Sequence, residues 1–181
     1  MSHAFAIWLT GLPASGKSAI AHVLRERLAE AGLTVEVLES DAMRRTVTPQ
    51  PTYGREERDL FYRAMVFCAG RLVAHGVPVV IDATGNRRAY RDLARNLIRH
   101  FVEVAVTCPL EVCQERDRKG IYQGGLRGRS STVPGLQDPY EPPLKPELEV
   151  DTVRTRPEEA ADRIMMWLRA RGYLAGARAV E

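Results

Sequence analysis

Short apolar runs alternate along the chain with longer segments in which apolar residues recur every three or four positions. The runs lie at 6–10, 34–38, 78–81, 101–106 and 148–150. Such runs are typical of buried strands, whereas the longer segments have the period of a helix that packs on one face. Because strands joined through helices pair in parallel with right-handed crossovers, the pattern predicts an α/β fold. We expect a three-layer arrangement with a parallel sheet of about five strands and helices on both faces.

The helical segments have recognisable boundaries. After residue 18, apolar residues continue at helical spacing until Gly32, which has the position of a glycine at a helix C-terminus. Further helices are expected from about Arg55, over 87–99, and as a short helix opened by Pro109. The sequence at 155–158, TRPE, has the pattern of a capping box and predicts the start of a C-terminal helix.

Two segments lack the helical period. Residues 43–53 contain several threonines and prolines, which favour an ordered turn or loop over a helix interior. Residues 118–146 are rich in glycine, proline and basic residues, and an irregular segment of this length inside a compact domain is usually functional or disordered. We therefore expect a single domain over residues 1–181, in which 118–146 forms a mobile lid or substrate loop.

The first apolar run ends in a glycine-rich sequence, GLPASGKS at 11–18. This is the phosphate-binding loop G-x-x-x-x-G-K-[ST] between a strand and a helix. Its glycines let backbone N–H groups surround phosphate oxygens at the positive end of the following helix. Lys17 would reach the β- and γ-phosphates, and the Ser18 hydroxyl would bind Mg²⁺. The motif predicts a P-loop kinase fold with ATP and Mg²⁺ as ligands. The expected phosphate-binding residues are Gly11, Leu12, Pro13, Ala14, Ser15, Gly16, Lys17, Ser18 and Ala19.

Two carboxylates follow apolar runs. Asp41 is expected to end the second strand, beside the phosphate loop, where it could accept a proton from an acceptor hydroxyl or hold Mg²⁺ through water. Asp82 ends the run PVVID and could hold Mg²⁺ through water as a second carboxylate. For both residues, the alternative is that the side chain caps or starts the next turn. We predict catalytic roles for Lys17 and Asp41.

Basic residues gather after these strand ends and in the glycine-rich segment. Arginine has a planar fork that suits phosphate and sulfate groups, although most arginines on helices are solvated. Arg44 and Arg58 are the expected acceptor-binding arginines. Arg116, Arg118, Lys119 and Arg127 lie in or beside the predicted lid and could close over the phosphates as the transition state forms. The alternative is a basic, solvated loop.

Composition changes this picture little. The chain has 45% hydrophobic and 27% charged residues and a net charge of +3, which suits polyanionic ligands and does not require nucleic acid. The three cysteines, Cys68, Cys108 and Cys113, have no metal-ligand spacing and are expected to be buried free thiols. We see no targeting segment and no stretch of membrane-spanning length, so we expect a cytoplasmic protein without a membrane partner.

Several segments together resemble the adenylylsulfate (APS) kinases, which use MgATP to phosphorylate the 3′-hydroxyl of adenylylsulfate. GLPASGKS is similar to the GLSGSGKS of that family, and LESDAMR at 38–44 lies where the family has LDGDNVR. FVEVAVTCPLEVCQERDRKGIY at 101–122 resembles FVEVFVDTPLEVCEARDPKGLY. GLQDPYEPP at 135–143 resembles GIDSPYEAP, and 148–152 resembles LVLDT. The resemblance covers nearly the whole chain in order.

The resemblance implies a role for each candidate residue. Asp41 corresponds to the catalytic or metal-orienting aspartate of the family, and Arg44 and Arg58 to arginines that contact the acceptor nucleotide. Tyr53 falls near a phenylalanine that packs on the adenine of the acceptor. Arg116 and Lys119 match lid positions near the ATP in that family. The resemblance also implies sulfate assimilation through synthesis of 3′-phosphoadenylylsulfate (PAPS), small-molecule substrates, and a homodimer.

The departures from the family lie on the acceptor side. Ala42 and Phe61 replace two asparagines, and Gly85 replaces a serine that can be phosphorylated in the family. Because polar groups that a substrate needs strongly affect selectivity, three functions remain open at this point. The chain could be an APS kinase, a related P-loop kinase for another hydroxyl compound such as a modified nucleotide or an antibiotic, or a regulatory protein that binds ATP without turnover.

Overall fold

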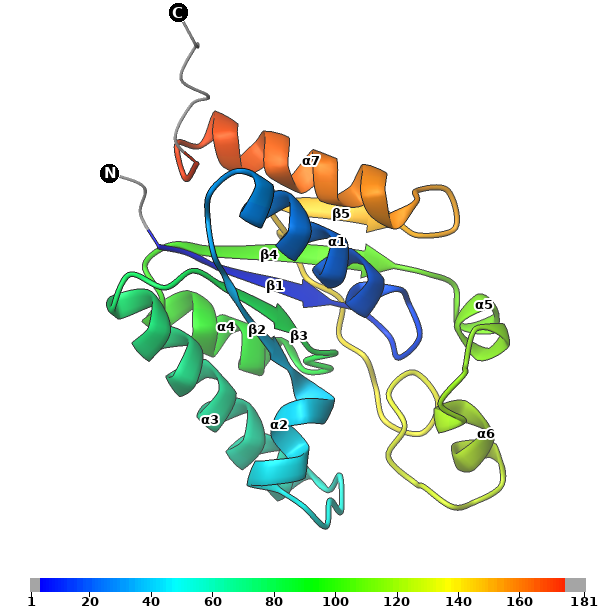
Figure 1. Cartoon of the computed structure of the whole chain (residues 1–181). Coiled ribbons are helices and arrows are strands. Elements are labelled where there is room, and N and C mark those ends of the chain that lie inside the picture. The colour runs from blue at the N-terminus through cyan, green and yellow to red at the C-terminus, as the bar shows by residue number, and fades with distance from the viewer. Residues whose placement is uncertain (1–3, 175–181) are drawn as a thin grey trace, which may run out of the picture.

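A computed structural model describes residues 4–174 of the chain. Its centre is a five-stranded sheet in which every neighbouring pair is parallel and the strand order is β2-β3-β1-β4-β5 (Figure 1). The strands are β1 (Ala6–Thr10), β2 (Glu36–Glu39), β3 (Val79–Asp82), β4 (Phe101–Thr107) and β5 (Leu148–Asp151). The predicted α/β fold with a parallel sheet is confirmed.

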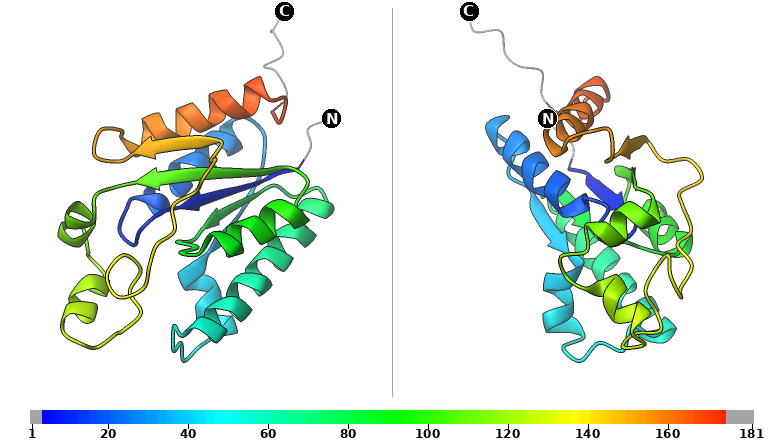
Figure 2. Two further views of the ribbon diagram at one scale, coloured as in Figure 1. Left: turned by 180° about the vertical axis from the view of Figure 1, so that it is seen from behind. Right: turned by 90° about the vertical axis from the view of Figure 1, so that its right-hand side faces the viewer.

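Helices cover both faces of the sheet. On one face, α1 (Lys17–Glu30) packs against α7 (Pro157–Ala170), and on the other, α3 (Arg55–Ala74) packs against α4 (Arg88–Leu97) (Figures 1 and 2). Successive side chains of a strand point to opposite faces. Accordingly, Ile7 and Leu9 of β1 belong to the core under α1 and α7, whereas Trp8 belongs to the core under α3 and α4.

The remaining helices lie beyond the carboxyl ends of the strands. They are α2 (Ser40–Val47), α5 (Leu110–Glu115) and α6 (Ile121–Leu126), and Figure 1 shows them at the edge toward which all five strand arrows point. Open α/β sheets bind ligands at this edge. The phosphate loop between β1 and α1 opens at the same place.

Part of the segment predicted as a loop is helical. Residues 43–53 were expected to be irregular, but 43–47 belong to α2, which begins directly after β2. Asp41 lies in its first turn and Arg44 and Arg45 in its last, which matches the sign of the helix dipole at each end. The helix ends before Thr48-Pro49, where the following proline disfavours the helical conformation. Within 118–146, α6 adds a helix to the predicted lid or substrate loop, and the movement of that segment stays a prediction.

Three further expectations were wrong in detail. The end of the second strand was expected beside the phosphate loop, and Glu39 at the end of β2 does line one cleft with Lys17, but β3 lies between β1 and β2, so these two strands are not neighbours. Thr155 does not cap α7: the N-cap is Arg156, without a side-chain cap, and Pro157 occupies the first turn. All three cysteines are free thiols, but Cys113 is buried whereas Cys108 is half-buried and Cys68 is exposed. No helix within residues 4–174 is long and apolar enough to cross a membrane.

Candidate active site

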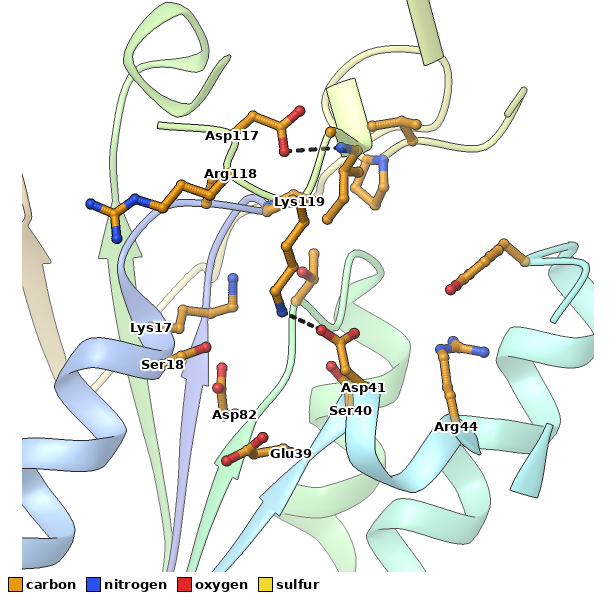
Figure 3. Close-up of a pocket in the computed structure, with 18 of the residues that line it drawn as sticks. Lys17, Ser18, Glu39, Ser40, Asp41, Arg44, Asp82, Asp117, Arg118 and Lys119 are labelled. Carbon is orange, nitrogen blue, oxygen red and sulfur yellow. Dashed lines mark hydrogen bonds and ion pairs between the residues drawn. The ribbon is translucent and has the colours of Figure 1, made fainter. Parts of the chain in front are cut away.

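A cleft of about 590 Å³ opens at the carboxyl edge of the sheet. The phosphate loop and the start of α1 form one wall, and the end of β2, α2 and α3 form the opposite wall (Figure 3). Residues 116–121, Gly124, Ser130 and residues 132–134 line it from above. Such a site, concave and with convergent charged groups, is the expected form of a ligand pocket.

The phosphate loop has the backbone conformation that a tight turn around an anion requires. Ala14 and Gly16 have positive φ angles of 59° and 102°, and the Ser15 N–H donates to Leu12 O at 3.2 Å. A non-glycine residue in this region carries strain that persists where the surroundings impose it. At Gly11, a Cβ atom would lie 2.3 Å from Val106 O, so only glycine lets the loop pack this closely on β4. Among the described residues, Ser15 Oγ is the one buried side-chain oxygen or nitrogen without a hydrogen-bond partner.

Lys17, the first residue of α1, folds its side chain back against the start of the phosphate loop. Its ammonium donates to Gly11 O at 3.0 Å and to Leu12 O at 2.7 Å, and the residue is 7% exposed. Burial lowers the pKa of Lys17, and the nearby carboxylates Asp82 and Asp41 act in the opposite direction. A cation is therefore already fixed at the loop where the phosphate charge would lie.

Three oxygen-bearing side chains lie near Lys17. Figure 3 shows the Ser18 hydroxyl and the carboxylates of Asp82 and Glu39 below the Lys17 side chain. Asp82 ends β3, as predicted, and is 6% exposed. Within residues 4–174, no group of three or more His, Cys, Asp or Glu side chains is arranged to hold a metal ion. This donor set suits Mg²⁺, which needs only one or two protein ligands when phosphate oxygens and waters supply the others.

Asp41 faces the phosphate loop from α2 and not from the end of a strand. Its Oδ2 pairs with Lys119 Nζ across the cleft (Figure 3). The hydrogen bond to Asp41 raises the pKa of Lys119, so the ammonium stays charged. Lys119 was predicted to bind ATP, and here its side chain joins the lid segment to the predicted base.

Arg44 is a buried arginine on the wall formed by the end of β2, α2 and α3, which we call the acceptor wall because the predicted acceptor-binding residues lie on it. It forms an ion pair with Glu57 at 2.8 Å. Its guanidinium lies over the ring of Phe61, 3.9 Å from the centroid, and 4.9 Å from that of Tyr53. Phe61, one of the departures from the family, is fully buried and therefore supports Arg44 from behind without lining the cleft.

Arg58 connects three segments of the acceptor wall. Its Nε donates to Tyr53 O at 2.8 Å and its Nη1 to Asn86 Oδ1 at 3.1 Å. Nη1 also lies 3.4 Å from a carboxylate oxygen of Asp138. Tyr53 has a φ of 56° and is 40% exposed, so its ring stands at the cleft mouth on a backbone that Arg58 holds in place.

Arg116 lies at the opposite end of the cleft. Its two terminal nitrogens donate to Thr152 Oγ1 at 3.2 Å and to Thr152 O at 3.1 Å. Thr152 Oγ1 in turn donates to Ser15 O at 2.8 Å. The conformation of the phosphate loop is thus linked through one threonine to the arginine predicted to contact ATP.

The structure brings the predicted residues together in one cleft. All seven predicted site residues outside the phosphate loop line the cleft. Within the loop, only Gly11, Leu12 and Ser15 do not line it. The seven are Asp41, Arg44, Tyr53, Arg58, Asp82, Arg116 and Lys119.

Sequence reasoning missed residues that hold these groups in place. They are Glu57, Asn86, Asp138 and Thr152. Asp138 and Thr152 lie in the segments that carry the family resemblance, which is a signal that could have found them. Glu57 and Asn86 have no signal in the sequence beyond their polarity.

Comparisons with known proteins agree with this geometry. The sequence model described as adenylylsulphate kinase matches residues 3–151. The adenylyl-sulfate kinase of Rippkaea orientalis is 43% identical over 169 residues, which are 93% of this chain and 93% of the relative. The chain belongs to the adenylylsulfate kinase family. Members of this family phosphorylate adenylylsulfate to PAPS, which is a phosphotransfer to an alcohol group.

Other family members show how far the likeness extends. The probable adenylyl-sulfate kinase of Pyrococcus abyssi is 36% identical, with 94% of this chain and 98% of that protein covered. The structure of the Mycobacterium tuberculosis APS kinase CysC in complex with AMPPNP and APS superposes with a TM-score of 0.87 at 28% identity. That superposition covers 93% of this chain and 99% of the other. The likeness to adenylylsulfate kinases therefore extends over nearly the whole chain.

Proposed function

We propose that this chain transfers the γ-phosphate of ATP to the 3′-hydroxyl of adenylylsulfate within the cleft described above, giving PAPS and ADP. The observation that carries the proposal is the position of Asp41. This carboxylate lies between a complete phosphate loop and a wall of buried arginines, so a hydroxyl bound on that wall would lie between the carboxylate and the γ-phosphate.

The donor half consists of the phosphate loop and the residues above it. The backbone N–H groups of the loop, which Pro13 lacks, would surround the phosphates, with the Lys17 ammonium on the β- and γ-phosphates. Bound Mg²⁺ would neutralise charge on the transferred phosphoryl group, held by Ser18 directly and by Asp41 and Asp82 through water. Arg116 lines the cleft at the loop end that Thr152 stabilises, where a fixed positive charge favours ATP.

The acceptor half is formed by α2, α3 and the loop between them. The exposed Tyr53 ring would stack on the adenine of adenylylsulfate, and the forks of Arg44 and Arg58 would bind its anionic groups. Arg44 is fixed by Glu57 and Phe61 before any ligand binds, so little conformational freedom is lost when the acceptor arrives.

The proton of the reacting hydroxyl would pass to Asp41. In the structure this carboxylate is paired with Lys119, and the two side chains are 55% and 66% exposed. Because exposed pairs contribute little, about 0–1 kcal/mol, substrates can separate them at small cost. Lys119 would then move to the phosphates while Asp41 accepts the proton, which gives one ion pair two uses in the cycle.

ADP release is the measurement that tests this function. Adenylylsulfate should stimulate ADP formation strongly, whereas AMP, gluconate and a nucleoside antibiotic should not, and the product should be PAPS by chromatography. Stimulation by another acceptor at equal or higher kcat/KM would contradict the proposal and favour the related kinase. ATP binding without any turnover would favour the regulatory protein.

The homodimer and the cytoplasmic location stay predictions. Light scattering of the purified protein tests whether it is a homodimer.

A further inference from the structure

Asn86 is a fully buried polar residue in the turn between β3 and α4. Its Oδ1 accepts from Arg58 Nη1 at 3.1 Å, and its Nδ2 donates to Asp138 Oδ2 at 2.8 Å and to Pro139 O at 3.2 Å. Its backbone oxygen accepts from the Glu141 N–H at 2.7 Å. One residue therefore joins α3, the turn after β3 and the segment 138–141. We call this segment the strap.

The amide of Asn86 is matched in polarity to both of its charged neighbours. Its carbonyl faces the guanidinium of Arg58, and its NH₂ group faces the carboxylate of Asp138. The two charges also lie within 3.4 Å of each other and are 6% and 19% exposed. Buried charges need such partners, because each unmade hydrogen bond carries a desolvation penalty.

The hydrogen bonds of Arg58 fix the direction of its fork. A guanidinium has five N–H donors. One on each nitrogen is used by the chain, with Tyr53 O, Asn86 Oδ1 and Thr132 O as acceptors. The two remaining N–H donors lie on Nη1 and Nη2 of Arg58. Asp138 approaches Nη1, and Arg58 itself lines the cleft. Asn86 is one of the groups that fix the rotation of these donors, and its amide also holds the carboxylate of Asp138.

We propose that Asn86 is a positioning residue for acceptor recognition, which orients Arg58 toward adenylylsulfate and joins it to the strap. This inference rests on the proposed acceptor role of Arg58. Asn86 directly follows Gly85, which is one of the departures from the family. The neighbouring Gly85 has a φ of 51°, and a Cβ there would lie 2.8 Å from the Trp8 ring, so the serine of the family does not fit this turn. At this edge of the proposed acceptor site, the chain therefore has a glycine turn followed by Asn86 in place of the family's serine.

Asn86→Ala tests the role, with Gln137→Ala as the matched control. Gln137 directly precedes the strap and holds it to α6 and to residue 133. Its Nε2 donates to Gly125 O at 3.0 Å and its Oε1 accepts from the Val133 N–H at 3.2 Å, and no hydrogen bond joins it to Arg58. Asn86→Ala should raise the KM for adenylylsulfate about tenfold, the effect of one charge-assisted hydrogen bond. The KM for ATP should change less than about twofold. Equal increases in the two variants, or an equal increase in the KM for ATP, would overturn the proposal, and thermal unfolding verifies that both variants fold.

An exchange of the two side chains tests the polarity of the contact. Asn86→Asp alone places two carboxylates face to face and should raise the KM for adenylylsulfate further than Asn86→Ala. In the double variant Asn86→Asp, Asp138→Asn, a carboxylate again accepts from Arg58 and an amide again faces it. Pro139 O loses its donor in both variants that carry Asn86→Asp, so the double variant should recover only part of the wild-type affinity, with a KM clearly below that of Asn86→Asp alone. A double variant whose KM is the product of the two single effects would overturn the proposal.

Arg58→Ala separates this inference from the function on which it rests. If Arg58→Ala raises the KM for adenylylsulfate and Asn86→Ala does not, only the positioning role of Asn86 is wrong. If Arg58→Ala leaves that KM unchanged while PAPS is still made, the acceptor role of Arg58 is wrong, and the inference about Asn86 is overturned with it.

Discussion

Glu57 is the residue whose loss should damage the acceptor wall most selectively. Its Oε1 lies 2.8 Å from Arg44 Nη1, and its Oε2 accepts from Thr52 Oγ1 at 2.7 Å and from the Thr52 N–H. Burial alone would raise the pKa of Glu57, but the hydrogen bonds from Thr52 and the charge of Arg44 lower it. Glu57→Gln keeps the shape of the side chain and removes its charge, so Arg44 remains buried without a counterion.

The magnitude follows from the burial of this pair. The side chains of Arg44 and Glu57 are 9% and 14% exposed, so the ion pair is largely shielded from contact with water. Removing one partner of a buried pair costs about 3–5 kcal/mol. Glutamine keeps one acceptor oxygen, so we expect about 2–3 kcal/mol, or roughly 5–10 °C in Tm for a chain of this size. Since Arg44 also loses its orientation, the KM for adenylylsulfate should rise about tenfold.

Glu56→Gln is the matched control. Glu56 is exposed and shares the first turn of α3 with Glu57, so both variants lose the same interaction with the helix dipole, about 0.3–1 kcal/mol. Urea unfolding gives the stability difference and ADP release gives the KM. If Glu57→Gln lies within about 0.5 kcal/mol of Glu56→Gln and leaves the KM unchanged, the reasoning about this wall is refuted.

Two predictions concern the phosphate loop and acid stability. Gly11→Ala should abolish ATP binding in a fluorescence titration because its Cβ would meet the backbone of β4 at 2.3 Å, whereas Gly70→Ala, in α3 outside the cleft and with only an ordinary contact to Ile98 at 3.8 Å, should bind ATP normally. For Glu147, burial would raise the pKa, but hydrogen bonds from Arg95 and from the Glu103 N–H lower it below 4.5. Glu147 therefore stabilises the fold fully above pH 4.5 and less as the pH falls through its folded-state value. The stability difference between wild type and Glu147→Gln, from urea unfolding, should be constant near neutrality and shrink below pH 4.5, and a difference that grows there would contradict the assignment.

The parts of the fold that were predicted correctly depend on local patterns. A buried strand and an amphipathic helix each leave their period in the sequence, and the phosphate loop contains its chemistry in eight consecutive residues at 11–18. The position of β2 outside β3 depends on contacts between segments far apart, which no local pattern records. The helix over Ser40–Val47 was missed because the threonines and prolines of 43–53 suggested a turn, whereas the charges at both ends of the helix favour it.

The site divides in the same way. Lys17, Asp41 and Arg44 follow strand ends that the sequence indicates, so their gathering at one edge could be predicted. The contact of Asn86 with Asp138 joins residues 52 positions apart. This contact depends on the path of residues 138–141 beside Arg58. The direction of the Arg58 N–H donors is therefore known only from the structure.

Asp41→Asn tests the central claim most directly, since it changes one oxygen of the predicted base to an amide. Turnover and ATP affinity are measured on the same preparation, by ADP release with saturating adenylylsulfate and by direct titration with an ATP analogue. We predict a fall in kcat of about 10²–10⁴-fold, the range for loss of a general base, with ATP affinity within about threefold of wild type. A kcat close to wild type, or a loss of ATP binding as large as the loss of turnover, would contradict the account.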